Sequence, residues 1–382
     1  MNKYKYMSII IFLLIILLKY YRIDAQYNVS IEIFSIDFSD EDEFKKHFDD
    51  TTECYDGGTK GNVGGYVDEI NNWYVFYGDN EDADGADEPT IVVQGYCEAD
   101  GTNSYAVFPY NYIVEAKFYC PSSPGHGNFY ILPRYHTVQN KYEVVADVEW
   151  NNLVFNKMVS NSWSNIKITP LGFTLQTDHW YKMTVEVKWE YNGAQGKYMN
   201  HIVATISDLS NPSNTKSDEI WDDSLTPDNY NGLAFLGFDY NDKFKLYIDD
   251  ILVTAVMEKI GEEPDESLTP SDLDVKYTYI YSDSENIFIL IKMAGSITTS
   301  TDTTKYWVVQ YDLDKDSRDT EYGWDYEYDS TISLSSGGKA SLSGGDHILG
   351  GGIGYNYYII QVDRDDLTSD SFFPLWIYSG RK

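Results

Sequence analysis

Basic residues are scarce in this chain of 382 residues: 28 Lys and Arg stand against 61 Asp and Glu, which gives a formal net charge of −33. A nucleic-acid interface needs clustered Lys and Arg to neutralise phosphates. Docking on an anionic membrane surface needs a basic patch as well. The composition therefore argues against both kinds of partner.

Cysteine is also scarce, with Cys54, Cys97 and Cys120 as the three thiols. Because no Cys-x-x-Cys or Cys/His grouping occurs, a structural zinc site is not expected. Three cysteines can form one intramolecular disulfide with one thiol left over. Cys97 and Cys120 lie in strand-like runs, and we expect that pair if a disulfide forms.

Long apolar runs are missing after the N-terminus. Lys3 and Lys5 precede an apolar run, Met7 to Leu18, and the segment closes at Ala25. This pattern predicts a secretory signal peptide over residues 1–25. The alternative is an uncleaved anchor, although the run is shorter than the roughly 20 residues of a spanning helix. Both alternatives place the remainder outside the cytoplasm, and a membrane contact is expected only through such an anchor.

Amphipathic helices are missing too, whereas aromatic residues reach 16% and Tyr alone contributes 35. Apolar and polar residues alternate over 31–36, 112–118 and 183–189. Period-two patterning with β-branched and aromatic residues is typical of strands with one buried face. Asn192-Gly193 between two such runs predicts a hairpin turn. The sequence therefore predicts an all-β protein built from sandwiches.

The composition changes after Met257. Residues 258–274 carry seven acids, one Lys, two Pro and no aromatic residue. This composition predicts a solvated linker, set at 259–271. The linker would separate a unit over 26–258 from a second unit over 272–382.

The first unit carries an ordered series of motifs. They are Ile36-Asp37-Phe38-Ser39, the strand-like run 112–119, Asn128-Phe129-Tyr130-Ile131, residues 140–144, residues 179–185, the Gly-flanked run 232–238 and the Asp-Asp run 246–253. The series resembles the concanavalin A-like, laminin-G-like jelly-roll superfamily over about 230 residues, by the pattern of strands and turns. The resemblance implies a jelly-roll β-sandwich.

The second unit carries a shorter series over about 100 residues, again by strand and turn pattern. It runs through Tyr279-Ile280-Tyr281-Ser282-Asp283, residues 286–291, residues 308–314, residues 322–328 and residues 359–363. The series resembles carbohydrate-binding family 9 and DOMON-type domains. It implies a second, smaller β-sandwich.

The sequence lacks the catalytic motifs that this resemblance would bring. Family 16 glycoside hydrolases of the jelly-roll superfamily place Glu-x-Asp-x-Glu on one strand, because retaining hydrolysis needs two carboxylates about 5–5.5 Å apart. Glu143, Asp147 and Glu149 come closest, but the first gap is too long. No Gly-x-Ser-x-Gly nucleophile elbow occurs either. We therefore expect no catalytic role.

Two acidic loops have the alternating oxygen ligands that Ca²⁺ prefers. The alternative is that both are solubilising turns of an acidic chain. The jelly-roll resemblance implies a third calcium position at Asp37 with Asp249 or Asp250. The predicted ligands of the two loops are Asn80, Asp82 and Asp84 in the first, and Asp312, Asp314 and Asp316 in the second.

Four tryptophans are candidate ligand platforms, because flat exposed rings stack on sugars. Trp163 is the best of them, since its neighbours are Ser and Asn; the others are Trp73, Trp221 and Trp324. The alternative for each is an ordinary core position.

Together these features predict a secreted or cell-surface, non-catalytic binding protein that recognises a glycan or another surface ligand, as a lectin or adhesin does. One alternative is a glycoside hydrolase or lyase of the jelly-roll superfamily with an unrecognised acid pair. Another is a structural envelope or filament subunit, which an exposed edge strand that pairs with another copy would favour.

Overall fold

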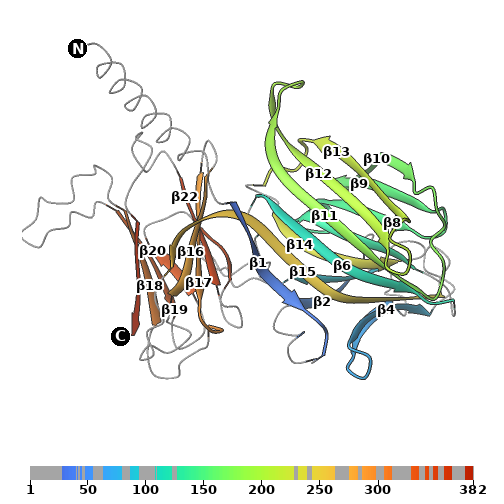
Figure 1. Ribbon diagram of the computed structural model, residues 1–382, viewed down its shortest axis with the longest axis horizontal. Helices are drawn as coiled ribbons and strands as arrows, with labels where there is room; N and C mark the ends of the chain where they lie inside the picture. The colour runs from blue at the N-terminus through green and yellow to red at the C-terminus, as the bar shows by residue number, and fades with distance from the viewer. Residues whose placement is uncertain are drawn as a thin grey trace, which may run out of the picture.

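The computed structural model describes residues 28–39, 41, 44, 48–54, 63–79, 87–93, 108, 110–122, 127–227, 231–238, 243–262, 275–282, 286–297, 305–311, 328–334, 340–343, 347–351, 357–363 and 375–381 (Figure 1). The expected all-β class is confirmed, since strands dominate these ranges. Within them no helix is long and apolar enough to cross a membrane. The predicted signal segment, 1–25, lies outside the described residues.

The first unit consists of two open sheets that face each other, which is the sandwich expected of a jelly roll (Figure 1). Sheet A contains β13 (Thr215–Asp222), β12 (Lys197–Asp208), β11 (His179–Asn192), β6 (Tyr112–Cys120) and β15 (Lys243–Glu262). β1 (Asn28–Ile36) and β4 (Trp73–Asp79) also pair with β15, and β3 (Val63–Asp68) pairs with β4. Sheet B contains β10 (Ser162–Pro170), β9 (Asn152–Val159), β8 (Lys141–Asp147), β7 (Asn128–Tyr135), β14 (Gly232–Phe238), β5 (Asp87–Val93) and β2 (Phe48–Cys54).

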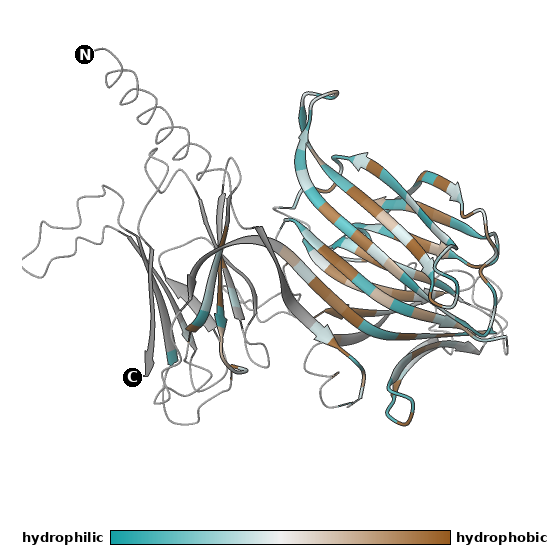
Figure 2. Cartoon of the chain, viewed as in Figure 1, coloured by the Kyte–Doolittle hydropathy of each residue, from teal (hydrophilic) through white to brown (hydrophobic). Residues whose placement is uncertain are grey.

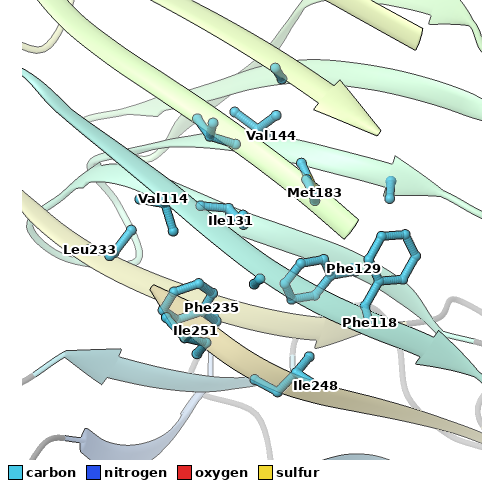
Figure 3. Close-up of a cluster of buried hydrophobic side chains, with 14 of the residues drawn as sticks. Val114, Phe118, Phe129, Ile131, Val144, Met183, Leu233, Phe235, Ile248 and Ile251 are labelled. Carbon is cyan, nitrogen blue, oxygen red and sulfur yellow. The ribbon is translucent and has the colours of Figure 1, made fainter. Parts of the chain in front are cut away.

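The core fills the space between the two sheets. Along β6, buried and half-buried residues alternate strictly, and apolar and polar residues alternate in the same way on β11 and β12 (Figure 2). Phe118 of β6 stacks on Phe129 of β7, and Phe129 in turn stacks on Phe235 of β14 (Figure 3). The period-two prediction is therefore confirmed, because the inward residues of each strand meet those of the opposite sheet.

The predicted hairpin joins β11 to β12, with Asn192 opposite Lys197. The Asn192 Oδ1 atom accepts the backbone N–H groups of Ala194 and Gln195 at 3.0 and 3.1 Å. Gly196, and not Gly193, takes the positive φ of 69°. The connection is therefore a four-residue turn closed by an Asn side chain.

A buried cation lies between the sheets at one end of the sandwich. Arg134, on β7, is fully buried. It donates from Nε to Asn200 Oδ1 at 2.8 Å, from Nη2 to the Tyr110 carbonyl at 2.6 Å and from Nη1 to Asn231 Oδ1. Its guanidinium carbon lies 5.7 Å from the ring centroid of Tyr112. These contacts join both sheets through one side chain.

Tyr142 continues this polar layer. Its hydroxyl donates to Asp222 Oδ1 at 2.6 Å, and Lys157 Nζ contacts the other carboxylate oxygen at 2.5 Å. Burial acts to raise the pKa of Asp222, but these hydrogen bonds outweigh it and hold the pKa below its ordinary value. Burial and the Asp222 charge raise the pKa of Tyr142, which therefore stays a neutral donor.

The open edge of the sandwich is closed by Asp218 of β13, which binds Lys167 Nζ at 2.6 Å and the Thr169 hydroxyl, both on β10. Burial acts to raise the pKa of Asp218, but the hydrogen bonds from Lys167 and Thr169 lower it to about 2. A carboxyl group whose pKa is depressed by folding stabilises above its unfolded pKa, and that contribution is lost as the pH falls towards the folded value.

We therefore expect Asp218→Asn to lower the free energy of unfolding by about 1 kcal/mol at pH 7, the small size reflecting the exposed setting. The difference from the unchanged protein should shrink as the pH falls from about 4 towards 2. Urea unfolding of both proteins at neutral and acidic pH measures it. Asp223→Asn, which changes an exposed pair with Lys197, is the matched control. A deficit that is the same at both pH values would contradict this role.

The described strands after residue 274 fall into two sheets. The strands β16 (Val275–Ser282), β17 (Asn286–Met293), β22 (Tyr357–Asp363) and β21 (His347–Gly351) extend sheet A, and β20 (Ala340–Ser343), β19 (Tyr328–Leu334), β18 (Lys305–Tyr311) and β23 (Leu375–Arg381) form a separate sheet. The membership of this second unit in the family 9 or DOMON class stays a prediction.

The start of the predicted linker is wrong. Residues 259–262 belong to β15, and Lys259 and Glu262 lie opposite Tyr279 and Tyr277 of β16. Acidic composition indicated solvent exposure, but a strand with one wet face tolerates acids equally well. Residues 263–271 lie outside the described part of the chain, and the division into two domains stays a prediction.

Candidate functional site

The predicted tryptophan platforms do not form one site. Trp163 lies on β10 of sheet B, whereas Trp73 and Trp221 lie on β4 and β13 of sheet A. Trp324 lies outside the described residues. The three described tryptophans therefore have to be considered one at a time.

Trp163 is half exposed, at 52% of its surface, on the edge strand of sheet B. Its indole N–H donates to Glu143 Oε2 at 3.3 Å, and the Asn156 amide donates to the same oxygen at 3.2 Å. Lys141 Nζ lies 3.3 Å from Glu143 Oε1. Asn165 donates to Asn156 Oδ1 at 2.9 Å. We call these five residues the Trp163 site.

The strand register explains the site. Glu143 of β8 lies directly opposite Asn156 of β9, which in turn lies opposite Asn165 of β10. Inward residues alternate with them, so Tyr142 and Phe155 point into the core. The polar set therefore shares the outward face of sheet B with the Trp163 ring.

The Glu143 carboxylate has three polar partners. Trp163 and Asn156 are neutral N–H donors to Oε2, and Lys141 lies beside Oε1. Glu143 is 5% exposed and Lys141 1% exposed. A carboxylate offers about four acceptor positions, so Glu143 retains acceptor capacity for an added hydroxyl group.

An apolar cluster lies beside the Trp163 site, separate from the main core. Because its members alternate with core residues, they occupy the outward side of sheet B, where they are buried. Trp163 is thus exposed at the edge of the outward face of sheet B, whose apolar residues are buried. The cluster consists of Val92, Tyr130, Leu132, Tyr135, Val145, Val154, Ala234, Leu236 and Phe238.

Trp73 belongs to a different feature, a group of four aromatic side chains on the outward face of sheet A. Its ring centroid lies 5.5 Å from that of Trp180 on β11, 5.1 Å from Tyr247 on β15 and 6.3 Å from Tyr119 on β6. All four rings are partly exposed. We call this group the aromatic row, because Trp180, Tyr119 and Tyr247 lie in direct register across three strands.

A groove of about 770 Å³ adjoins the aromatic row and contains two ion pairs. Lys182 Nζ lies 3.0 Å from Glu115, and Lys117 contacts Asp250. The hydrogen bond to Asp250 raises the pKa of Lys117, against the effect of burial. An ammonium group thus already neutralises Asp250, one of the carboxylates at which the resemblance implies calcium.

No metal centre is evident among the described residues. No group of three or more His, Cys, Asp and Glu side chains within them could hold an ion. Burial raises the pKa of Asp249, and the negative charge of the neighbouring Asp250 raises it further. The six predicted calcium ligands of the acidic loops, Asn80, Asp82, Asp84, Asp312, Asp314 and Asp316, lie outside the described residues.

Trp221 is covered on one face by the His201 ring, at 4.1 Å between centroids and an interplanar angle of 7°. His201 Nδ1 lies 2.6 Å from Glu190, and Nε2 lies 2.9 Å from Glu219. This stack binds three adjacent strands together. Trp221 is half-buried.

Sequence reasoning missed several of these residues. Glu143 was considered only with Asp147 and Glu149, yet Asp147 accepts the backbone N–H of Trp150 at 3.1 Å and Glu149 lies in the exposed turn after β8. Alternation could have placed Tyr119 and Trp180 on an outward face. Their assembly with Trp73 depends on pairing between distant strands, which no local pattern shows.

Cys120 is buried, and its sulfur lies 3.4 Å from the carbonyl oxygen of Gly127. Cys97, its expected disulfide partner, lies outside the described residues. The predicted pairing is therefore not tested.

No protein-family model matches the chain, and no curated protein matches it in sequence. Similar solved structures include a carbohydrate-binding module from Bacillus subtilis (10% identity, TM-score 0.32, 50% of this chain and 92% of that one). Others are the lumenal domain of VIP36 with Ca²⁺ and Man3GlcNAc (11%, 0.36, 63% and 95%) and a Bacteroides ovatus mixed-linkage-glucan GH16 protein (12%, 0.34, 58% and 99%). At these identities and TM-scores, function has to be inferred from this chain's own side chains.

Proposed function

We propose that the protein is an exported, non-catalytic carbohydrate-binding protein that holds its ligand at the Trp163 site. The observation that supports this most directly is the half-exposed Trp163 ring, whose indole N–H donates to the carboxylate of Glu143. An aromatic face covers the apolar C–H surface of a sugar, and convergent carboxylate and amide groups accept and donate to its hydroxyl groups.

The charge of the site favours a neutral sugar. Lys141 and Glu143 balance each other, and Asn156 and Asn165 are uncharged. A sugar hydroxyl can donate to Glu143 without bringing a charge into a buried setting, which would be costly. A negatively charged sugar would also be repelled by a chain of net charge −33.

The test is binding of the purified full chain to an array of neutral and acidic glycans. We expect retention of neutral glycans, and Trp163→Ala should weaken it by roughly tenfold or more, because a central aromatic anchor is lost. Glu143→Gln keeps the shape and removes the charge, so it should weaken binding by a smaller factor. Binding is measured by titration with the retained glycan.

Trp150→Ala is the matched control, because Trp150 is 70% exposed in the turn between β8 and β9. It should leave binding within about twofold, as expected for a residue outside the interface centre. Equal losses in both variants, or no retention of any glycan, would overturn the proposal.

Two further readouts of the same experiment address the other expectations. Repeating the array with a chelator tests whether the acidic loops at Asn80–Asp84 and Asp312–Asp316 make binding calcium-dependent. Analysis of the glycans for new reducing ends tests for hydrolysis. If new reducing ends appear, the protein is a hydrolase and not a non-catalytic binding protein.

A further inference from the structure

We infer that the aromatic row is a second binding site, and that its ligand is a small aliphatic diamine. The row lies on sheet A, whereas the Trp163 site lies on sheet B, so the two sites are independent. The inference rests on aromatic surface, on fixed negative charge at both ends of the row, and on the charge of the whole chain.

The aromatic surface is larger than one ring. Tyr119 lies 5.3 Å from Trp180 and 5.6 Å from Tyr247, measured between centroids. Trp73 packs edge-on against both Trp180 and Tyr247, at interplanar angles of 64° and 60°. Aromatic faces attract cations through their quadrupole, and Trp does so most strongly. Four adjoining rings can therefore cover an alkyl chain and face its charged ends.

One end of the row carries Asp178. This carboxylate accepts the Tyr119 hydroxyl at 3.1 Å and the Ser122 backbone N–H at 3.0 Å. The hydrogen bonds from Ser122 hold the pKa of Asp178 below its ordinary value, so the group is anionic at neutral pH. Burial, followed by the bond to Asp178, raises the pKa of Tyr119, which stays neutral.

The other end carries Asp68, which lies opposite Trp73 in the β3–β4 pair. It accepts the Asn71 side-chain amide at 2.9 Å and the Ile70 backbone N–H at 3.2 Å. The Asn71 hydrogen bond holds the pKa of Asp68 below its ordinary value. Asp68 is the last residue of β3 and Asp178 directly precedes β11, so the two hydrogen-bonded carboxylates lie on the outermost strands that border the aromatic row.

Two of the neighbouring cations are already paired with carboxylates. Lys117 and Lys182, two residues along β6 and β11, are paired with Asp250 and Glu115. Lys245 lies two residues from Tyr247 on β15 and shares its side of the strand. A ligand with ammonium groups at both ends fits this arrangement, because each can approach a carboxylate while the methylene groups lie on the rings.

The experiment titrates the full chain with diaminopentane at low salt and follows heat and tryptophan emission. Pentanediol, the neutral analogue, and pentylamine, with one ammonium group, are the ligand controls. We expect diaminopentane to bind more tightly than pentylamine, and pentanediol not to bind over the same range. Salt should weaken the binding, since the carboxylates are exposed to solvent.

Three variants locate the site. Asp178→Asn should weaken diaminopentane binding by roughly fivefold, and Trp180→Phe by roughly twofold, in line with one charged contact and one ring. Lys245→Gln should strengthen it, because a like charge is removed. Asp223→Asn removes the same charge directly after β13, away from the aromatic row, and should change diaminopentane binding by less than about twofold.

Equal losses with Asp178→Asn and Asp223→Asn would overturn the inference, because they would show attraction to the total charge alone. Equal binding of diaminopentane and pentanediol would also overturn it. If Trp180→Phe failed to fold, the variants of the exposed Asp178 and the half-buried Lys245 would still decide. Trp163→Ala should leave diamine binding unchanged, so that failure of the glycan proposal and failure of this one are distinguishable.

Discussion

Replacing Arg134 with Met is expected to lower the free energy of unfolding by about 3–5 kcal/mol, because three buried acceptors are left unsatisfied at about 1–3 kcal/mol each. Asn200, Asn231 and the Tyr110 carbonyl each lose a donor, and buried acceptors that lose a donor destabilise strongly. Met has a similar length, so the cavity contribution is small. Denaturant unfolding of the two proteins measures the difference.

Lys197→Met is the matched control for this change. Lys197 pairs with Asp223 at the surface, with side chains 49% and 44% exposed. Exposed ion pairs contribute about 0–1 kcal/mol, so the control should stay within that range. A loss of less than about 1 kcal/mol in Arg134→Met as well would show that the network adds no stability.

Adding one methyl group at Gly237 should also destabilise the sandwich, by about 1–3 kcal/mol, because it overpacks the core. A Cβ atom there would lie 2.7 Å from the Cβ and 2.8 Å from the Cγ of Phe76. Phe76 belongs to β4 of sheet A and Gly237 to β14 of sheet B, so the contact lies between the sheets. The Phe76 Cβ atom cannot move unless the strand moves.

Gly193→Ala tests the same chemical change where there is space. No atom lies within 4 Å of a Cβ built at Gly193 in the β11–β12 turn. This change should be neutral or stabilise by up to about 1 kcal/mol through the unfolded chain. Thermal unfolding of both variants compares them, and an undiminished melting temperature in Gly237→Ala would contradict the packing argument.

The sequence predicted what depends on local order. Alternation along residues 112–118 and 183–189 gave the correct class and the correct inward residues, because the side-chain period of a strand is a local property. Asn192 marked its hairpin for the same reason. Trp163 was singled out from its polar neighbours, and it is half exposed.

The features that were missed depend on register between distant strands. Arg134 and Asn200 are 66 positions apart in the sequence. Tyr119, Trp73 and Tyr247 come from three strands that are distant in the sequence, and their rings pack together. Glu143 appeared as one of several acids until its partners on β9 and β10 were known. Composition likewise could not show that residues 259–262 continue a strand.

The course of β15 has a mechanical consequence. This 20-residue strand pairs with β1, β4 and β6 in the first unit and then with β16 in the second. β1 runs antiparallel to β15, and its first residue pairs near the C-terminal end of β15: Asn28 lies opposite Glu258, and Ile36 lies opposite Ile251. Tension applied between Asn28 and the second unit would therefore act on one end of this ladder. The β1 strand would peel off one hydrogen bond at a time, at low force, while the pairing of β15 with β6 stays intact.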